Sequence, residues 1–321
     1  MVVIAISAFL DDANIPPDGI VVTQVFPGGC SFSCPFCVVE RRGERRLTSS
    51  LSPDGYADLV HSLGKRGLLG GAAVVGDEPL QASAWPYVRR YIEAANIYGV
   101  PTALITNGYE LNEFIPHLRR LDISELIVSV DAIGQRHDSI RRKVGAFAAI
   151  KRGLLQASDD DLLRDRLVIG TILMPGNAAD VRNVIRFAAT HGIRRIALSP
   201  LLIVTRASPL RVHPRVLEVG QSLIPEFRSL AAALGVDLFL ADDFQALGDW
   251  ADALRAAGVP VKAPSRAARL LRVDAGGNIS TYREIQLGLP PSQTLPLNGP
   301  GIEGLANSCL ADCPDKFVSA A

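Results

Sequence analysis

Short apolar runs alternate along the chain with segments in which apolar residues recur at helical spacing. Between residues 85 and 98, Val88, Tyr91, Ile92 and Ala95 fall at i, i+3, i+4 and i+7, which predicts the buried face of a helix. The apolar runs predict strands over residues 19–26, 72–75, 102–106, 125–130, 167–174 and 195–199. Helices are predicted between them, over residues 54–65, 85–98, 111–118, 135–156 and 181–188.

This succession of strand–helix units predicts an α/β fold with a parallel sheet, because parallel neighbours need crossover connections. The strands are apolar without interruption, as expected when both faces of a sheet are covered. The number of units fits an open, partial (β/α)6 barrel and is too small for a closed eight-unit barrel. In such sheets the functional site lies at the carboxyl ends of the strands.

After residue 202 the pattern becomes less regular. A helix near 214–233 and a strand over 236–240 are predicted, followed by a hairpin with strands at 270–273 and 279–282 around a glycine-rich turn. We therefore expect an N-terminal extension (1–18), a barrel core (19–205), a helix-and-strand extension of the barrel (206–262) and a small C-terminal α+β cap (263–321).

The composition narrows the range of partners. The 33 basic and 33 acidic residues balance, which gives no electrostatic case for nucleic acid or an acidic membrane surface. No apolar run approaches the roughly 18 residues that span a bilayer. The first ten residues lack the basic region and cleavage site of a signal peptide. We expect a cytoplasmic protein without a nucleic-acid or membrane partner.

Three of the five cysteines, Cys30, Cys34 and Cys37, follow the first predicted strand within eight residues. An odd number of cysteines without a secretion signal argues against a disulfide framework. Three thiolates in a tight loop can hold an iron–sulfur cube and leave one of its irons open to another ligand. The alternative is a zinc site, but structural zinc prefers four ligands, and the first histidine is the distant His61.

The spacing Cys-x3-Cys-x2-Cys, with Phe36 just before the last cysteine, resembles the signature loop of the radical S-adenosylmethionine (SAM) superfamily. Further segments resemble motifs of that family in the same order, over about residues 20–202. They are Gly76-Asp77-Glu78-Pro79, Thr106-Asn107-Gly108, Ser129-Val130-Asp131 and His137-Asp138-Ser139-Ile140-Arg141-Arg142. The chain departs from the family pattern at Asp77, where glycine is usual.

The resemblance implies an enzyme with one [4Fe–4S] cluster on Cys30, Cys34 and Cys37, and with SAM bound to the open iron. An external one-electron donor of the flavodoxin or ferredoxin type would reduce the cluster. SAM would then be cleaved to methionine and a 5′-deoxyadenosyl radical, which takes a hydrogen atom from the substrate.

The SAM-binding residues that the resemblance implies fall into groups by role. Gly76 to Pro79 would bind the amino group, Ser129 the carboxylate or ribose, and Arg141 or its neighbour Arg142 the carboxylate. The full set is Phe36, Gly76, Asp77, Glu78, Pro79, Asn107, Ser129, Asp131, Arg141 and Arg142.

Two cysteines remain near the end of the chain, Cys309 and Cys313. Together with residues 274–282 they resemble the SPASM or twitch extensions of some family members, which carry auxiliary clusters. Two thiols are too few for an ordinary four-ligand cluster, so we expect a degenerate extension without one. These thiols either pack as small apolar groups, cycle as a dithiol pair or, like Tyr282, donate a hydrogen atom to a substrate radical.

The substrate is not fixed by these residues. Only 29 residues precede Cys30, which favours a small molecule over a peptide, such as a sugar, aminoglycoside or nucleoside in natural-product biosynthesis. The reaction would be epimerisation, dehydrogenation, dehydration or decarboxylation. The alternatives are a peptide-modifying maturase, a glycyl-radical activase, or a metal-stabilised binding protein that is not an enzyme.

Four arginines follow the cysteine loop, between residues 41 and 46. They indicate either a site for an anionic substrate or a solvated surface loop.

Overall fold

The computed structural model describes residues 19–41, 51–203, 211–240, 255, 269–281 and 293–294. All the strands predicted for the barrel core are present, and each is parallel to the next along the chain. They are β1 (Ile20–Gln24), β2 (Leu69–Val74), β3 (Thr102–Thr106), β4 (Glu125–Ser129), β5 (Leu167–Leu173) and β6 (Arg195–Pro200). The predicted parallel α/β sheet is therefore confirmed.

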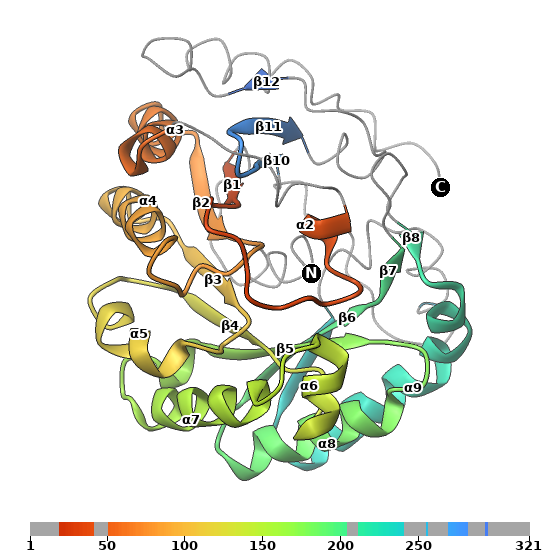
Figure 1. Cartoon of the computed structure of the whole chain (residues 1–321). Coiled ribbons are helices and arrows are strands. Elements are labelled where there is room, and N and C mark those ends of the chain that lie inside the picture. Colours follow the sequence, from red (N-terminus) through yellow and green to blue (C-terminus); the bar gives the residue numbers. More distant parts are fainter. Residues whose placement is uncertain are drawn as a thin grey trace.

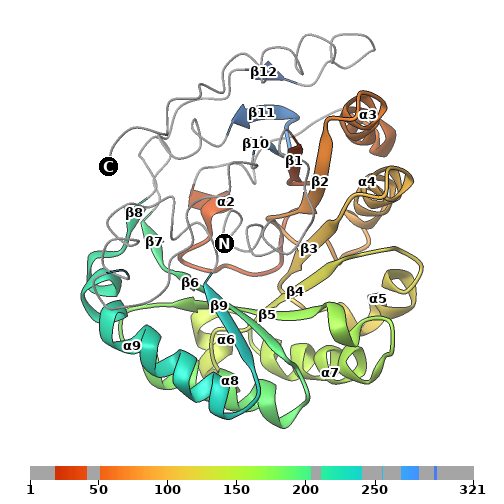
Figure 2. The same ribbon diagram turned by 180° about the vertical axis from the view of Figure 1, so that it is seen from behind.

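Most helices cover the outer face of the curved sheet, whereas the short α2 lies on its inner side (Figures 1 and 2). The helices are α2 (Val38–Arg41), α3 (Pro53–Lys65), α4 (Trp85–Ile97), α5 (Leu111–Leu118), α6 (Gln135–Arg141), α7 (Ala146–Asp159), α8 (Ala178–Thr190) and α9 (Pro214–Ala233), with the 3-10 turn η2 (Arg164–Arg166). Within the described ranges, none of these helices has both the length and the apolar character needed to span a membrane.

Two further parallel strands extend the sheet at its edges (Figures 1 and 2). β9 (Asp237–Leu240) pairs with β6, and β10 (Arg269–Val273) pairs with β1. The predicted hairpin is present, since β11 (Asn278–Thr281) returns antiparallel to β10 and β12 (Gln293–Thr294) follows it. In the described part of the chain, β9 and β10 do not pair, so the sheet stays open. A separate ribbon joins β7 (Leu202–Ile203) and β8 (Arg211–Val212).

The sequence predicts the hairpin but not its place beside β1. Leu270, Leu271 and Val273 of β10 are all buried, so this strand is covered on both faces like the barrel strands. Pairing with β1 covers an edge that would otherwise expose unpaired backbone groups. The hairpin turn is tied to the barrel by α3, because the Tyr56 hydroxyl donates to the carbonyl of Ala275 at 2.8 Å.

One predicted helix, over residues 135–156, is wrong in extent because the chain breaks it into α6 and α7. Arg142 and Gly145 both have left-handed backbone angles, with φ of 53° and 77°. The carboxylate of Asp138 accepts from the backbone N–H groups of Gly145 (2.7 Å) and Phe147 (2.8 Å), which caps the start of α7. Apolar periodicity continues across the break, and so does not detect it.

The core has two layers, because alternate residues of each strand face opposite sides of the sheet. Val22 and its equivalents pack under the outer helices, whereas Val21 and its equivalents fill the inside of the barrel. This two-sided burial explains why the strands are apolar throughout. The inside is packed with side chains such as Ala73, Ala103 and Ile127, so the functional site must lie above it, at the strand ends.

Candidate functional site

The cysteine loop leaves β1 and enters α2 at the carboxyl edge of the sheet. Cys30, Cys34 and Cys37 are partly buried thiols outside any disulfide, and they are the only cysteines among the described residues. All three line one small cavity of about 60 Å³. At Gly28 the φ of 142° favours glycine, and a Cβ there would also stand only 3.0 Å from the side chain of Gln81.

The segment after β2 forms a second wall of this cavity. Gly76 and Asp77 line it, and both have positive φ, of 80° and 43°. Asp tolerates the left-handed region better than most residues, so the chain keeps this turn where the family usually has glycine. The backbone N–H of Glu78 donates to the carbonyl of Gly29 at 3.1 Å, which ties the segment to the cysteine loop.

The side chain of Glu78 points away from the cavity and connects two strand ends. Its carboxylate accepts from the Thr106 hydroxyl (2.5 Å) and from the backbone N–H groups of Leu80 (2.9 Å) and Asn107 (2.7 Å). Burial raises its pKa to about 7, although these hydrogen bonds act to lower it. Glu78 and the buried Pro79 are not among the residues that line the cavity, so the structure places them behind its wall.

Asn107, directly after β3, faces the cysteine loop. Its Oδ1 accepts from the backbone N–H of Tyr109 at 2.8 Å, and its Nδ2 lies 3.5 Å from the sulfur of Cys30. The backbone N–H of Phe32 donates to the same sulfur at 3.4 Å. Two N–H groups from different elements therefore point at Cys30.

A buried ion pair forms the third wall, at the end of β4 and of α6. Nε of Arg141 lies 2.6 Å from Oδ2 of Asp131, and both side chains are almost fully buried. The other carboxylate oxygen of Asp131 accepts from the backbone N–H of Ile172 at 2.9 Å. The neighbouring Arg142 is exposed at the left-handed end of α6, so the structure brings Arg141, and not Arg142, to the cavity.

Arg141 also contacts the cysteine loop directly. Its guanidinium carbon lies 5.4 Å from the centre of the Phe36 ring, and its carbonyl accepts from the sulfur of Cys34 at 3.7 Å. Burial raises the pKa of Cys34, and the positive charge of Arg141 opposes this by favouring the thiolate. A cation next to clustered thiols favours the binding of negatively charged groups, such as thiolates or a carboxylate, at this site.

Two residues of the site have roles that were not predicted from the sequence. The Nδ1 of His137 accepts from the backbone N–H of Asp131 at 3.2 Å, and burial together with Arg141 lowers the pKa of His137 to about 4. Arg41 donates two hydrogen bonds to the carbonyl of Pro35, from Nε at 2.9 Å and Nη2 at 2.6 Å. Arg41 positions the cysteine loop and His137 positions Asp131, in each case through a backbone group six residues away.

The remaining predicted residues lie beside the cavity or outside the described residues. Ser129 is buried at the end of β4, in register with Gly170 of β5, and is not among the lining residues. Tyr282, Cys309 and Cys313 lie outside the described residues. Their predicted role as hydrogen-atom donors stays a prediction.

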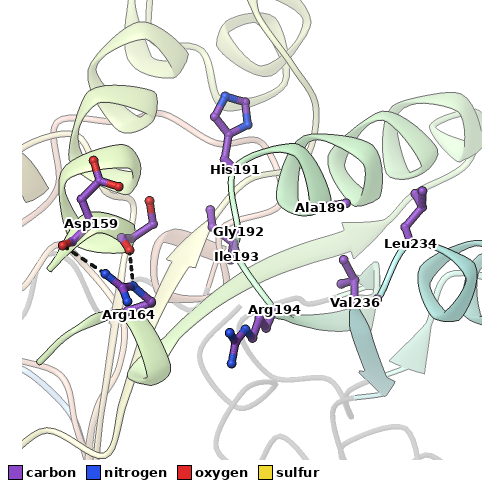
Figure 3. Close-up of a pocket in the computed structure, with 11 residues that line it drawn as sticks. Asp159, Arg164, Ala189, His191, Gly192, Ile193, Arg194, Leu234 and Val236 are labelled. Carbon is purple, nitrogen blue, oxygen red and sulfur yellow. Dashed lines mark hydrogen bonds between the residues drawn. The ribbon is translucent and has the colours of Figure 1, made fainter. Parts of the chain in front are cut away.

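A second and larger cavity, of about 370 Å³, lies at the opposite end of the barrel. Figure 3 shows residues that line it. It is lined by residues at the amino ends of β5, β6 and β9, among them His191 and Val236. Arg164 there donates to the backbone carbonyls of Ser158 (2.8 Å) and Asp159 (3.3 Å), as the dashed lines of Figure 3 show. None of the sequence motifs reaches this cavity.

Comparison with known proteins identifies the family. A family model described as the radical SAM superfamily matches residues 25–188, which is about half of the chain and includes all three clustered cysteines. The chain belongs to the radical SAM superfamily. The predicted enzyme class is therefore confirmed, whereas the predicted SPASM or twitch extension is not. Among curated proteins, no match was found for this radical SAM enzyme.

Several solved structures share the fold of this chain. SuiB of Streptococcus suis bound to SAM superposes with a TM-score of 0.60 at 12% identity, over 93% of this chain and 68% of that one. SuiB in a second structure gives the same TM-score over 65% of its length, so this chain spans about two thirds of SuiB. anSMEcpe with bound AdoMet and a peptide gives 0.58 at 13% identity, over 89% of this chain and 82% of that one. These likenesses confirm a partial, open barrel.

Proposed function

We propose that the protein binds one [4Fe–4S] cluster through Cys30, Cys34 and Cys37, binds SAM beside it, and cleaves SAM by one-electron reduction. One observation carries this proposal: the three thiols of a single loop line one cavity together with a buried arginine. This donor set fits the cluster, because three thiolates hold a cube and leave one iron for SAM. It does not favour structural zinc, which prefers four protein ligands.

The charges around the cavity match the two ends of the methionine part of SAM. Arg141 suits the carboxylate, because a guanidinium binds carboxylates through two parallel hydrogen bonds. Asp77 and the backbone carbonyls of Gly76 and Asp77 suit the ammonium, because they are hydrogen-bond acceptors on the cavity wall. Phe36 would shield the cluster, and Ser129 would bind the ribose beside β5. Arg142, which is exposed, is the weaker of the two arginine candidates.

The bound cluster and SAM supply the difficult chemistry, in which one electron breaks a sulfur–carbon bond of SAM and yields a hydrogen-abstracting radical. The protein holds these groups and excludes water. Phe32, Val38, Val39 and Ile105 line the cavity with apolar surface, and the barrel interior below it is packed. An external donor of the flavodoxin or ferredoxin type would supply the electron.

We propose a small molecule as substrate, with a peptide as the second candidate. The second is favoured by the fold shared with anSMEcpe, whose structure holds a peptide, over 89% of this chain. Co-purification of a peptide or protein partner would favour it. Conversion of a small molecule by the isolated enzyme would favour the first candidate.

Anaerobic reconstitution tests the proposal. We expect about four irons per chain, a brown protein and formation of 5′-deoxyadenosine from SAM only when a reductant is present. Bound zinc, or four irons without any cleavage of SAM under strong reductant, would overturn it.

A further inference from the structure

Asn107 is held in one orientation by the backbone around it. Its Oδ1 lies 2.8 Å from the backbone nitrogen of Tyr109, which can only donate. The atom facing Tyr109 must therefore be the amide oxygen, and the NH2 group must face Cys30, where Nδ2 lies 3.5 Å from the sulfur. The usual ambiguity between the two amide atoms of asparagine does not arise here.

The backbone of Asn107 is fixed as firmly as its side chain. Its N–H donates to the buried carboxylate of Glu78 at 2.7 Å, and the same carboxylate accepts from the hydroxyl of Thr106. Glu78 is in turn tied to the cysteine loop, because its own N–H donates to Gly29. The amide donor and the sulfur it faces thus belong to one rigid frame of two strand ends and the loop.

A donor fixed in this way has a predictable effect on an iron–sulfur cluster. When the cluster gains one electron, its sulfur ligands become more negative, and an N–H dipole aimed at a sulfur stabilises that added charge. Hydrogen bonds to the sulfurs are among the features that set the reduction potential of such clusters. The second donor to Cys30, the backbone N–H of Phe32, remains present whatever stands at position 107.

We infer that Asn107 is a positioning residue that raises the reduction potential of the cluster through its hydrogen bond to Cys30. The inference rests on the proposed function, because it needs a cluster on the three thiols. It goes beyond that function by assigning one side chain to control of the electron transfer that starts the reaction.

Asn107→Asp is the closest test. The new carboxylate keeps the acceptor for Tyr109 and replaces only the amide that faces Cys30. We expect the midpoint potential of the [4Fe–4S] cluster, measured by a dithionite titration followed by EPR, to become more negative than in the wild type. Asn107→Ala removes the donor without adding charge, so its potential should lie between the other two.

Asn177 provides a matched control on another strand end. It is equally buried, its Oδ1 accepts from the N–H of Met174 at 2.7 Å, and its Nδ2 donates to the carbonyl of Ile172 at 2.8 Å instead of to a sulfur. Asn177→Asp should lower the melting temperature and leave the cluster potential unchanged.

The outcomes separate the two claims. A wild-type protein that binds no cluster overturns the proposed function and this inference with it. A wild-type cluster whose potential is unchanged in both Asn107 variants overturns the inference alone. An equal shift in Asn177→Asp also overturns it, because the shift would then report general loosening of the fold.

Discussion

The two cavities, at opposite ends of the barrel, differ in how exposed the charged side chains that line them are. At the amino ends of the strands, the larger cavity has arginines at its surface, with the side chain of Arg194 76% exposed. At the carboxyl ends, the smaller cavity is walled by Arg141, whose side chain is 4% exposed and paired with the fully buried Asp131. Burying both charges is expensive, and a buried pair is weak evidence for stability alone. Volume therefore does not identify the site; buried charge next to clustered thiols does.

The largest difference between the two ends should appear when one group is removed from each. Cys37→Ala takes away one of the three thiols, so we expect the iron content to fall from about four per chain to nearly none and SAM cleavage to be lost. His191→Ala, in the larger cavity, should keep both. Iron analysis and 5′-deoxyadenosine formation measure this, and retention of four irons by Cys37→Ala would contradict the account.

The ion pair gives the next largest effect. Arg141→Met leaves the carboxylate of Asp131 buried without its partner, which should lower the free energy of unfolding by about 3–5 kcal/mol. Urea unfolding of the cluster-free protein measures this without interference from iron. Arg182→Met is the control, because the pair between Arg182 and Glu226 lies at the surface and should contribute far less. Equal losses in the two variants would show that Arg141 is no different from a surface arginine.

The buried carboxyl group of Glu78, behind the cavity wall, should make the free energy of unfolding depend on pH. The pKa of Glu78 is raised to about 7 from 4.5, so the folded protein holds a proton that the unfolded chain releases in this range. The contribution of Glu78 to the free energy of unfolding is therefore full below pH 4.5 and is lost as the pH rises through 7.

Urea unfolding between about pH 5 and 8 tests this dependence. The stability of the wild type relative to Glu78→Gln should decrease over the range, because glutamine does not titrate. Glu226→Gln is the control: Arg182 lowers the pKa of Glu226, so this group titrates below the range. A constant difference between the wild type and Glu78→Gln would refute the raised pKa.

The smallest effect is expected from Arg41, which fixes the cysteine loop from the solvent side. Arg41→Gln removes the two hydrogen bonds to the carbonyl of Pro35. We expect the cluster to assemble with full iron content but to be lost faster in air. Arg89→Gln, on the outer helix α4, should decay like the wild type. The visible absorbance of the iron–sulfur cluster, followed in air, measures this loss. If it fades at the same rate in both variants, Arg41 has no role in holding the loop.

The sequence predicts much of the fold because each barrel strand is a local apolar run and each helix a local periodicity. It misses two features for different reasons. The helix break at Arg142 is local, since Asp138 caps a helix that begins a few residues later, but the apolar periodicity continues across it. The place of β10 beside β1 joins segments about 250 residues apart, such as Thr23 and Leu271, and no short window of sequence contains both.

The candidate site, like the fold, is predicted from the sequence only in part. The motifs predict which residues gather at the strand ends, because carboxyl ends of parallel strands share one edge. They do not predict orientation: Glu78 faces away from the cavity, Arg141 enters it and Arg142 does not. Nor do they predict the roles of Arg41 and His137, whose partners are backbone groups that any residue type would supply.

The central claim is that one iron of the bound cube is left open and takes SAM as its ligand. It is tested most directly by pulsed EPR of the reduced cluster with SAM carrying 15N in its amino group. The account predicts a 15N hyperfine coupling that appears only when SAM is added and that disappears with the cluster in Cys37→Ala. A reduced cluster whose spectrum is unchanged by SAM would contradict it.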